Sequence, residues 1–201
     1  MTLYSVHENS EKFATLGFDQ DQMFTVFGKL RNQFSVNYQP KPYAEKLIDP
    51  LKVNFGLEDP PTSAGTEIPD ISNHYGRLFL NPKAYDALKD LLKNDGEFLP
   101  VVYENGKGYI FNTLSVAESV DGLDKKLSLK NEYGDVRNVA FDKNRVGDFM
   151  IFRTSFDNYI NAYVHQKLKD AIEDADLHGV YFSIDLGNPY SEKHAQSLQN
   201  D

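Results

Sequence analysis

The sequence contains no cysteine and no tryptophan. Without cysteine there are no disulfide bonds, no thiol nucleophiles, and no zinc or iron–sulfur sites with cysteine ligands. The stability of the fold must therefore come from packing. Of the 201 residues, 40% are hydrophobic and 13% aromatic, with 12 Tyr and 14 Phe. This apolar surface is enough to offset the entropy that the chain loses on folding, so we expect a folded protein.

Long apolar runs are also lacking. No run approaches the length of roughly 18 residues that a membrane-spanning helix needs. The first residues, MTLYSVHENSEKF, have neither the basic segment nor the uninterrupted apolar segment of a secretory signal. We therefore expect a cytoplasmic protein that makes no membrane contact.

Positive charge is scarce, because 21 basic residues stand against 30 acidic ones and give a net charge of −9. The excess is spread out, with −5 in residues 1–120 and −4 in the remainder. Such a field repels nucleic acid and anionic membranes, and it speeds the encounter with a basic partner such as the nucleic-acid-binding face of a nuclease. The simpler interpretation is that the acidic balance keeps the protein in solution.

The length fits one domain of residues 1–201. Six of the nine prolines lie between residues 40 and 69, which indicates irregular, extended backbone there. The segment 60–66, PPTSAGT, is the clearest candidate for a linker. It marks either the seam between an N-terminal lobe, residues 1–60, and the rest of the chain, or a surface loop within a single domain.

Two segments have the pattern of an amphipathic helix. Residues 81–94 begin with Asn81 and Pro82, which suit the N-cap and the first helical position, and their apolar face consists of Ala84, Leu88, Leu91 and Leu92. Residues 163–177 carry the second apolar face, which consists of Val164, Leu168, Ala171, Ile172 and Ala175. These two segments are the main helices that the sequence predicts.

Strand patterns occupy much of the remainder. Residues 3–6 and 180–186 read as strands, and residues 116–152 as a series of short ones. Residues 18–35 fit both a helical and a strand period, and the alternation through Phe24 and Val26 favours a strand. We predict an α+β fold with a mostly antiparallel sheet.

The stretch 103–112, YENGKGYIFN, contains two glycines around a lysine and raises the question of a phosphate-binding loop. Such a loop needs a longer glycine frame and a lysine followed by Ser or Thr at the start of a helix. Here Gly108 is followed by an aromatic strand sequence. Since Asn-Gly between apolar runs is a strong hairpin signal, we predict two strands, residues 98–103 and 108–114, joined by a type I′ turn at Asn105-Gly106.

Motifs for catalysis or metal binding are missing. None of the five histidines has a second histidine or an acidic residue at a zinc-binding spacing, and there is no G-x-S-x-G element. Asp148 and Asp185 are candidates for acid–base chemistry, but acidic residues in turns usually serve the turn itself. We predict no enzyme activity, no catalytic residue, no metal and no cofactor.

The second predicted helix breaks a local rule of charge. Its C-terminal half holds Asp170, Glu173, Asp174 and Asp176, where the helix dipole disfavours each anion by about 0.3 kcal/mol or more. Spacings of three and four residues place Asp170, Glu173 and Asp174 on one side. We predict that these four residues form a binding site for a basic partner. The alternative is a solvated face that a pair between Lys169 and Glu173 partly relieves.

Three stretches carry a family resemblance. Residues 68–88, IPDISNHYGRLFLNPKAYDAL, lead from an Ile/Pro-Asp element to a strand and a capped helix. Residues 96–121, GEFLPVVYENGKGYIFNTLSVAESVD, hold the hairpin, and residues 150–182 run from a strand ending in Phe-Arg to a helix and Gly-Val-x-Phe. In this order, over residues 68–185, the chain resembles an immunity-protein family found beside polymorphic and contact-delivered bacterial toxins. A long Lys-rich stretch, residues 123–145, departs from the family pattern.

The resemblance implies a small cytoplasmic protein that binds a cognate toxin or effector and neutralises it by covering its active surface, without catalysis. It adds no catalytic residues. Two alternatives come from other classes of protein. One is a hydrolase or transferase whose carboxylates converge only in the fold, and the other is a structural or adaptor module of a phage or secretion apparatus.

Overall fold

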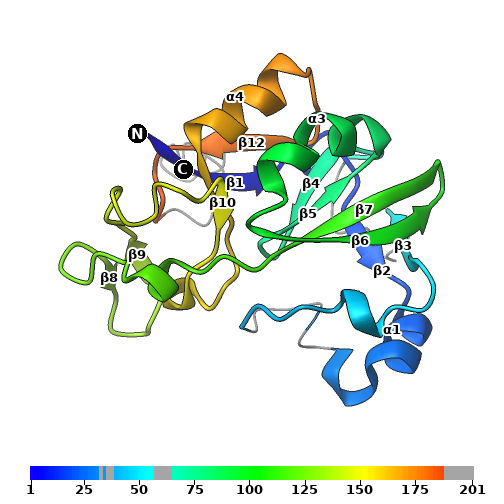
Figure 1. Cartoon of the computed structure of the whole chain (residues 1–201), viewed down its shortest axis with the longest axis horizontal. Coiled ribbons are helices and arrows are strands. Elements are labelled where there is room, and N and C mark those ends of the chain that lie inside the picture. Colours follow the sequence, from blue (N-terminus) through cyan, green and yellow to red (C-terminus); the bar gives the residue numbers. More distant parts are fainter. Residues whose placement is uncertain (32–33, 35–38, 57–64, 188–201) are drawn as a thin grey trace, which may run out of the picture.

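The computed structural model describes residues 1–31, 34, 39–56 and 65–187. Within these ranges the chain forms three α-helices and mostly antiparallel sheets, which confirms the predicted α+β class. Two sheets lie side by side, and the helices α3 and α4 lie together above them (Figure 1). The predicted segment 60–66 falls, apart from its last two residues, outside the described residues. The number of domains stays a prediction.

The larger sheet has six strands in the order β2-β3-β6-β7-β5-β4. In chain order they are β2 (Leu16–Phe18), β3 (Leu51–Phe55), β4 (Ile71–His74), β5 (Arg77–Leu80), β6 (Gly96–Tyr103) and β7 (Gly106–Thr113). The pair β3 and β6 is parallel, and the other neighbours are antiparallel. Strands from the first 60 residues therefore form one side of this sheet.

The smaller sheet has four strands in the order β10-β11-β1-β12, all antiparallel. They are β1 (Leu3–Glu8), β10 (Ile151–Phe152), β11 (Tyr163–His165) and β12 (Val180–Ser183). The two sheets meet where β4 approaches β1, since the Asn73 side-chain amide donates a hydrogen bond of 3.0 Å to the carbonyl of Val6. A third pair, β8 (Leu129–Lys130) and β9 (Val136–Asn138), stands apart from both sheets.

The two predicted helices are present with shorter bounds. Helix α3 (Pro82–Leu92) is capped by Asn81, whose Oδ1 accepts a hydrogen bond of 2.9 Å from the Ala84 amide. Helix α4 (Gln166–Asp174) starts later than predicted because the three preceding residues pair with β1 as β11. His165 then caps α4 by accepting a hydrogen bond from the Lys167 amide at its Nδ1.

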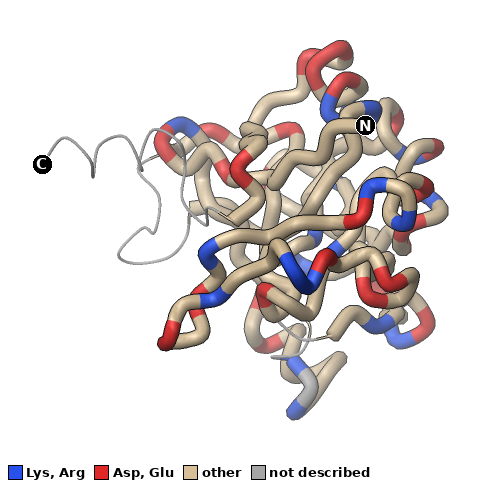
Figure 2. Tube along the Cα trace, turned by 90° about the vertical axis from the view of Figure 1, so that its left-hand side faces the viewer, with Lys and Arg blue, Asp and Glu red and all other residues tan. Residues whose placement is uncertain are grey.

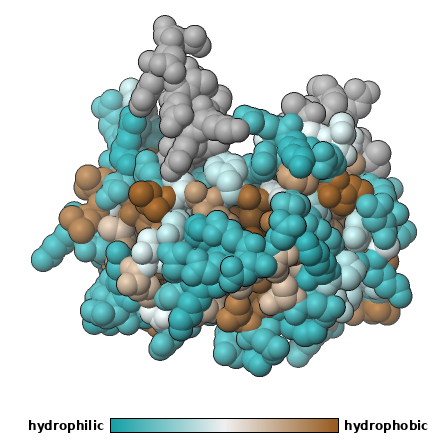
Figure 3. Space-filling model, turned by 90° about the horizontal axis from the view of Figure 1, so that it is seen from above, coloured by the Kyte–Doolittle hydropathy of each residue, from teal (hydrophilic) through white to brown (hydrophobic). Residues whose placement is uncertain are grey.

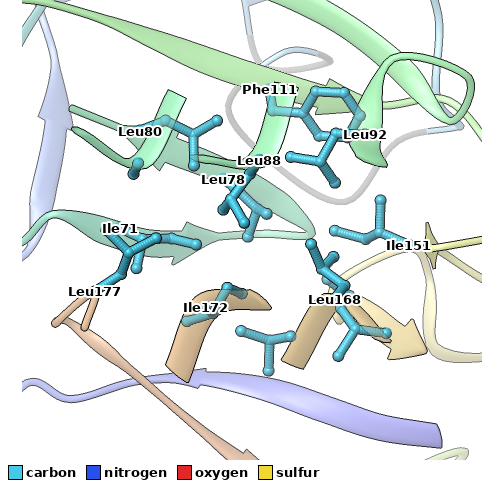
Figure 4. Packing of buried hydrophobic residues seen from close by; sticks show 14 residues of the cluster. Ile71, Leu78, Leu80, Leu88, Leu92, Phe111, Ile151, Leu168, Ile172 and Leu177 are labelled. Carbon is cyan, nitrogen blue, oxygen red and sulfur yellow. The ribbon is translucent and has the colours of Figure 1, made fainter. Parts of the chain in front are cut away.

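The central core lies between the helix pair and both sheets (Figure 4). Helix α3 contributes Ala84, Leu88 and Leu92, and α4 contributes Leu168 and Ile172. The facing sheet residues include Val6, Ile71, Leu78, Leu80, Phe111, Ile151 and Val164. Because strands from both ends of the chain supply this cluster, the sheets share one hydrophobic core.

Two further clusters cover the other faces. One joins α1 to the outer side of the larger sheet, and its aromatic members are Phe18, Phe27, Phe34, Tyr43, Phe55 and Phe79. The other joins β10 and β11 to the segment between β7 and β10, and it includes Ala117, Phe141, Val146, Phe152 and Tyr163. The segment 116–152 contains the short strands β8, β9 and β10 and a 3-10 helix, Ala117–Val120, and much of the remainder packs through side chains without regular pairing.

The strand predicted within residues 18–35 is wrong. This segment begins with Phe18 at the end of β2 and continues as helix α1 (Gln20–Phe27), followed by a 3-10 turn, Gly28–Leu30. Asp19 caps the helix by accepting a hydrogen bond of 2.8 Å from the Gln22 amide. Met23 and Phe27 are buried at helical spacing, whereas Phe24 is 58% exposed. The strand prediction was wrong because it took the exposed Phe24 to be a core residue.

The hairpin β6–β7 is confirmed, but its turn is displaced by one residue. Tyr103 pairs with Gly106, so the two turn residues are Glu104 and Asn105. Only Gly106 has a positive φ, 130°, and it already belongs to β7. A type I′ turn at Asn105-Gly106 is therefore wrong. Lys107 lies in the strand with its side chain exposed.

Candidate functional site

The four predicted site residues lie in the second half of α4 and directly after it, and we name them the acidic helix end. Asp170, Glu173, Asp174 and Asp176 are all exposed. The opposite side of the helix is fixed in the central core by Leu168 and Ile172. The carboxylates thus stand on a well-anchored element rather than on a loose loop.

Local interactions organise this surface. Lys169 and Glu173 form the predicted ion pair, with Nζ and Oε2 2.5 Å apart, and Gln166 donates a hydrogen bond of 2.6 Å to Asp170. Asp176, two residues after the last residue of the helix, has a positive φ of 50°, and its carbonyl accepts a hydrogen bond of 2.6 Å from Lys83 of α3. Within the described part of the chain, Asp174 makes no side-chain hydrogen bond or ion pair. The group keeps an excess of negative charge.

The acidic helix end is the uppermost part of the molecule in Figure 2, where its red positions cluster. The neighbouring helix differs, because Asp86 pairs with Lys89 and Asp90 with Lys93. From the side of the two helices the surface is mainly hydrophilic, with hydrophobic residues scattered among polar ones (Figure 3). Binding on this side would depend on charge more than on apolar burial.

No sequence pattern indicated the two arginines that the structure shows to be buried. Arg77 on β5 is 1% exposed and Arg153, directly after β10, is 0% exposed. Arg153 donates hydrogen bonds to the carbonyl of Thr113, including one of 3.0 Å from Nε, and one of 3.4 Å to the Asn112 side chain. Burial, and then the charge of Arg77, lower the pKa of Arg153, but a guanidinium group keeps its proton at neutral pH.

The surroundings of these arginines tie distant segments together. The Asn112 amide also donates to the carbonyl of Lys41 and to Glu97, both at 2.8 Å. Glu97 in turn accepts the main-chain amide of Tyr43 at 2.6 Å. The network joins β6, β7 and β10 to the segment before β3. Its hydrogen bonds are directed inward, so it fits a structural role.

His74 lies beside the same network. Burial, and then the charge of Arg77, lower its pKa to about 4. The imidazole is therefore neutral at physiological pH and packs edge-on against Phe18, with ring centroids 5.3 Å apart. Among the described residues, no group of three or more His, Cys, Asp or Glu could hold a metal ion.

Three carboxyl groups have a raised pKa, and burial is the largest cause for each: Glu8, Asp95 and Asp157. Asp95 binds the Met150 amide at 2.7 Å and the Ser115 hydroxyl at 2.8 Å, and Asp157 binds the Tyr163 hydroxyl at 2.8 Å. They lie in three different segments, and none affects the pKa of another. The structure does not bring them together as an acid–base pair.

One serine and one histidine lie within the distance of a nucleophile and its base. Ser5 Oγ is 2.8 Å from Nε2 of His7 on the same strand. The Ser5 side chain is 1% exposed, and its hydroxyl also points at the carbonyl of Ser183, 3.4 Å away. Because a nucleophile must reach its substrate, this buried pair fits the packing of the sheet better than catalysis. The candidates Asp148 and Asp185 are both exposed, and Asp185 meets the pair only through its main-chain carbonyl, 3.5 Å from Ser5 Oγ.

Comparison with models of known families and with curated proteins gives no match to this sequence. Among the residues that the structure describes, no helix is long and apolar enough to cross a membrane.

Proposed function

We propose that this chain is a non-catalytic immunity protein that binds a bacterial toxin and neutralises it by covering its active surface. The observation that carries the proposal is the acidic helix end, a set of exposed carboxylates on a helix whose other side is fixed in the core. The resemblance of residues 68–185 to a toxin-immunity family supports it. An inhibitor needs a rigid, complementary surface and no reactive group.

The charge of this surface indicates the charge of the partner's active surface. Carboxylates at the end of α4, in a protein of net charge −9, favour a toxin whose active surface is basic. Enzymes that act on nucleic acid have such surfaces, because their substrate is a polyanion. We therefore propose a nucleic-acid-directed toxin that acts in the cytoplasm, where this chain would meet it.

Co-expression tests the proposal directly. Open reading frames that neighbour this gene are expressed in a heterologous host, and any that kills the cells is co-expressed with the chain while cell survival is counted. We expect survival with the chain, and a complex of one toxin to one chain in size-exclusion chromatography with light scattering. Killing that the chain does not prevent, together with no complex, contradicts the proposal.

The same measurement separates the alternatives. An adaptor module would assemble into larger particles instead of a one-to-one complex. A hydrolase or transferase would protect at amounts far below that of the toxin, since each molecule turns over many times. Titration of the chain against a fixed amount of toxin therefore distinguishes an inhibitor from an enzyme.

A further inference from the structure

The segment 123–145 differs in charge from the rest of the molecule. It holds six basic and four acidic residues within a chain of net charge −9. Its strands β8 and β9 form a sheet of their own, outside the two main sheets. We name this segment the basic hairpin module. It lies at the lower left of Figure 1, and that side of the molecule faces the viewer in Figure 2.

A groove of about 630 Å³ separates the module from the segments 156–161 and 185–187. Its apolar lining comes from Val136, Phe156, Ile160 and Leu186, and Ile160 is 38% exposed. Nearby on the hairpin, Tyr133 is 82% exposed. Two consecutive residues of the opposite wall, Asn158 and Tyr159, have positive φ angles of 60° and 61°. Such a backbone persists only where the surrounding structure holds it.

The carboxylates of the groove are already engaged by the chain's own donors. Asp135 accepts the Asn131 side-chain amide at 2.8 Å, and Asp185 accepts the Gly187 amide at 3.2 Å. Asp157 is only 5% exposed and accepts the Tyr163 hydroxyl at 2.8 Å.

The cations of the groove are not engaged in this way. Within the described part of the chain, Lys130 and Arg137 make no ion pair or hydrogen bond through their side chains. Lys130 is held over the ring of Phe156, with Nζ 4.9 Å from the centroid, and Arg137 is exposed. The three carboxylates thus have neutral hydrogen-bond donors of the chain itself, whereas the two cations have no hydrogen-bond acceptor there.

We propose that the groove binds an acidic segment of a partner protein, with a carboxylate on Lys130 and Arg137 and a bulky apolar side chain against Phe156 and Ile160. The partner chemistry follows from the two cations and the apolar lining. Arg137 can bind a carboxylate through two parallel hydrogen bonds. This site is independent of the acidic helix end, which favours a basic partner, and it does not rest on the proposed function.

A protein segment fits this groove better than nucleic acid. A polyanion would meet the three carboxylates of the lining and the overall charge of −9. It would also need a longer track of cations than one pair. A peptide needs only one or two carboxylates at the cations, and its apolar side chain fills the remainder of the groove.

Selection from a random 12-residue peptide library displayed on phage, with the whole chain as bait, tests the proposal. We expect one enriched class that combines Asp or Glu with Leu, Phe or Tyr. A synthetic peptide of that class should bind at least tenfold more weakly to the double variant Lys130→Glu/Arg137→Glu, by fluorescence anisotropy. Its affinity for the unchanged protein should fall as salt is raised.

The control reverses two lysines elsewhere, Lys89→Glu on α3 and Lys93→Glu directly after it, and should leave peptide affinity within twofold. Circular dichroism of both variants should match the unchanged protein, since all four positions are at the surface. No acidic class, or an acidic class that binds the groove variant equally well, overturns the proposal. Fluorescent single-stranded DNA that binds the unchanged protein but not the groove variant, with no acidic peptide enriched, would assign the cations to nucleic acid instead.

Discussion

Gly76 packs directly against Arg153. A Cβ atom at position 76 would lie 2.3 Å from Cδ of Arg153, and the glycine has a φ of 72°. Tyr75, the residue before it, also has a positive φ, 48°, and the two form the turn of the β4–β5 hairpin. The buried guanidinium therefore lies beneath a turn that tolerates only glycine at its second position.

The variant Gly76→Ala should be strongly destabilised. The new methyl group must displace the aliphatic part of Arg153, and the alanine must adopt a left-handed backbone conformation. Together these two effects should lower the free energy of unfolding by about 3 kcal/mol or more. The control is Gly134→Ala, where φ is 87° but no atom lies within 4 Å of the new Cβ. Strain alone should cost about 1 kcal/mol there. Urea unfolding measures both, and equal losses would show that the contact with Arg153 does not matter.

The stability of the fold should depend on pH through Glu8. Burial raises the pKa of its carboxyl group from 4.5 to about 7, so the folded state favours the neutral form. This contribution is fully present below pH 4.5 and is lost as the pH rises through about 7. The variant Glu8→Gln does not ionise. The free energy of unfolding of the wild type, relative to this variant, should fall by about 1–3 kcal/mol from pH 4.5 to pH 8.

Urea unfolding at a series of pH values measures this difference. The control is Glu132→Gln, an exposed position on the β8–β9 hairpin, whose difference from the wild type should stay flat. Titration of the Glu8 carboxyl by NMR gives an independent check. A midpoint near 4.5 would show that the group is not shielded from water.

The sequence predicted those elements whose signals are local. The Asn81-Pro82 start and the leucine spacing identified α3, and the apolar runs on either side of Asn105-Gly106 identified β6 and β7. Helix α1 was missed although Asp19 is a good N-cap, because its stripe of Met23 and Phe27 is short and Phe24 interrupts it. The β4–β5 turn was missed because tyrosine rarely adopts a positive φ.

The candidate site shows the same division. The apolar face that contains Leu168 and Ile172 was enough to place Asp170, Glu173 and Asp174 on the opposite, outer side of α4. The buried arginines have no local signal, since Arg153 binds Thr113, 40 residues away in the chain. Long-range contacts of this kind depend on how the sheets pack, which no short pattern encodes.

The N-terminal third should be unable to separate from the rest of the chain. Residues 1–60 supply β1, which lies between β11 and β12, and also β2 and β3 of the larger sheet. A fragment of residues 61–201 would leave β11 and β12 without their common neighbour, so we expect it not to unfold cooperatively. For the full chain, the urea curves from far-UV and near-UV circular dichroism should coincide. A cooperative transition of the fragment would indicate a separate N-terminal lobe.

If the proposed function is right, charge reversal on α4 should slow binding of the proposed toxin partner. The triple variant Asp170→Lys, Glu173→Lys, Asp174→Lys replaces three exposed carboxylates, so we expect the association rate to fall on the order of tenfold at low salt. The association rate of the variant should also depend less on salt concentration. Stability should change little, because cations suit the C-terminal end of a helix even though the pair of Lys169 with Glu173 is lost.

The matched control, Asp86→Lys and Asp90→Lys on α3, breaks two similar lysine pairs and should keep the association rate within twofold. Stopped-flow measurement at two salt concentrations decides between the surfaces, and an unchanged rate for the triple variant would exclude the acidic helix end as the contact that guides association.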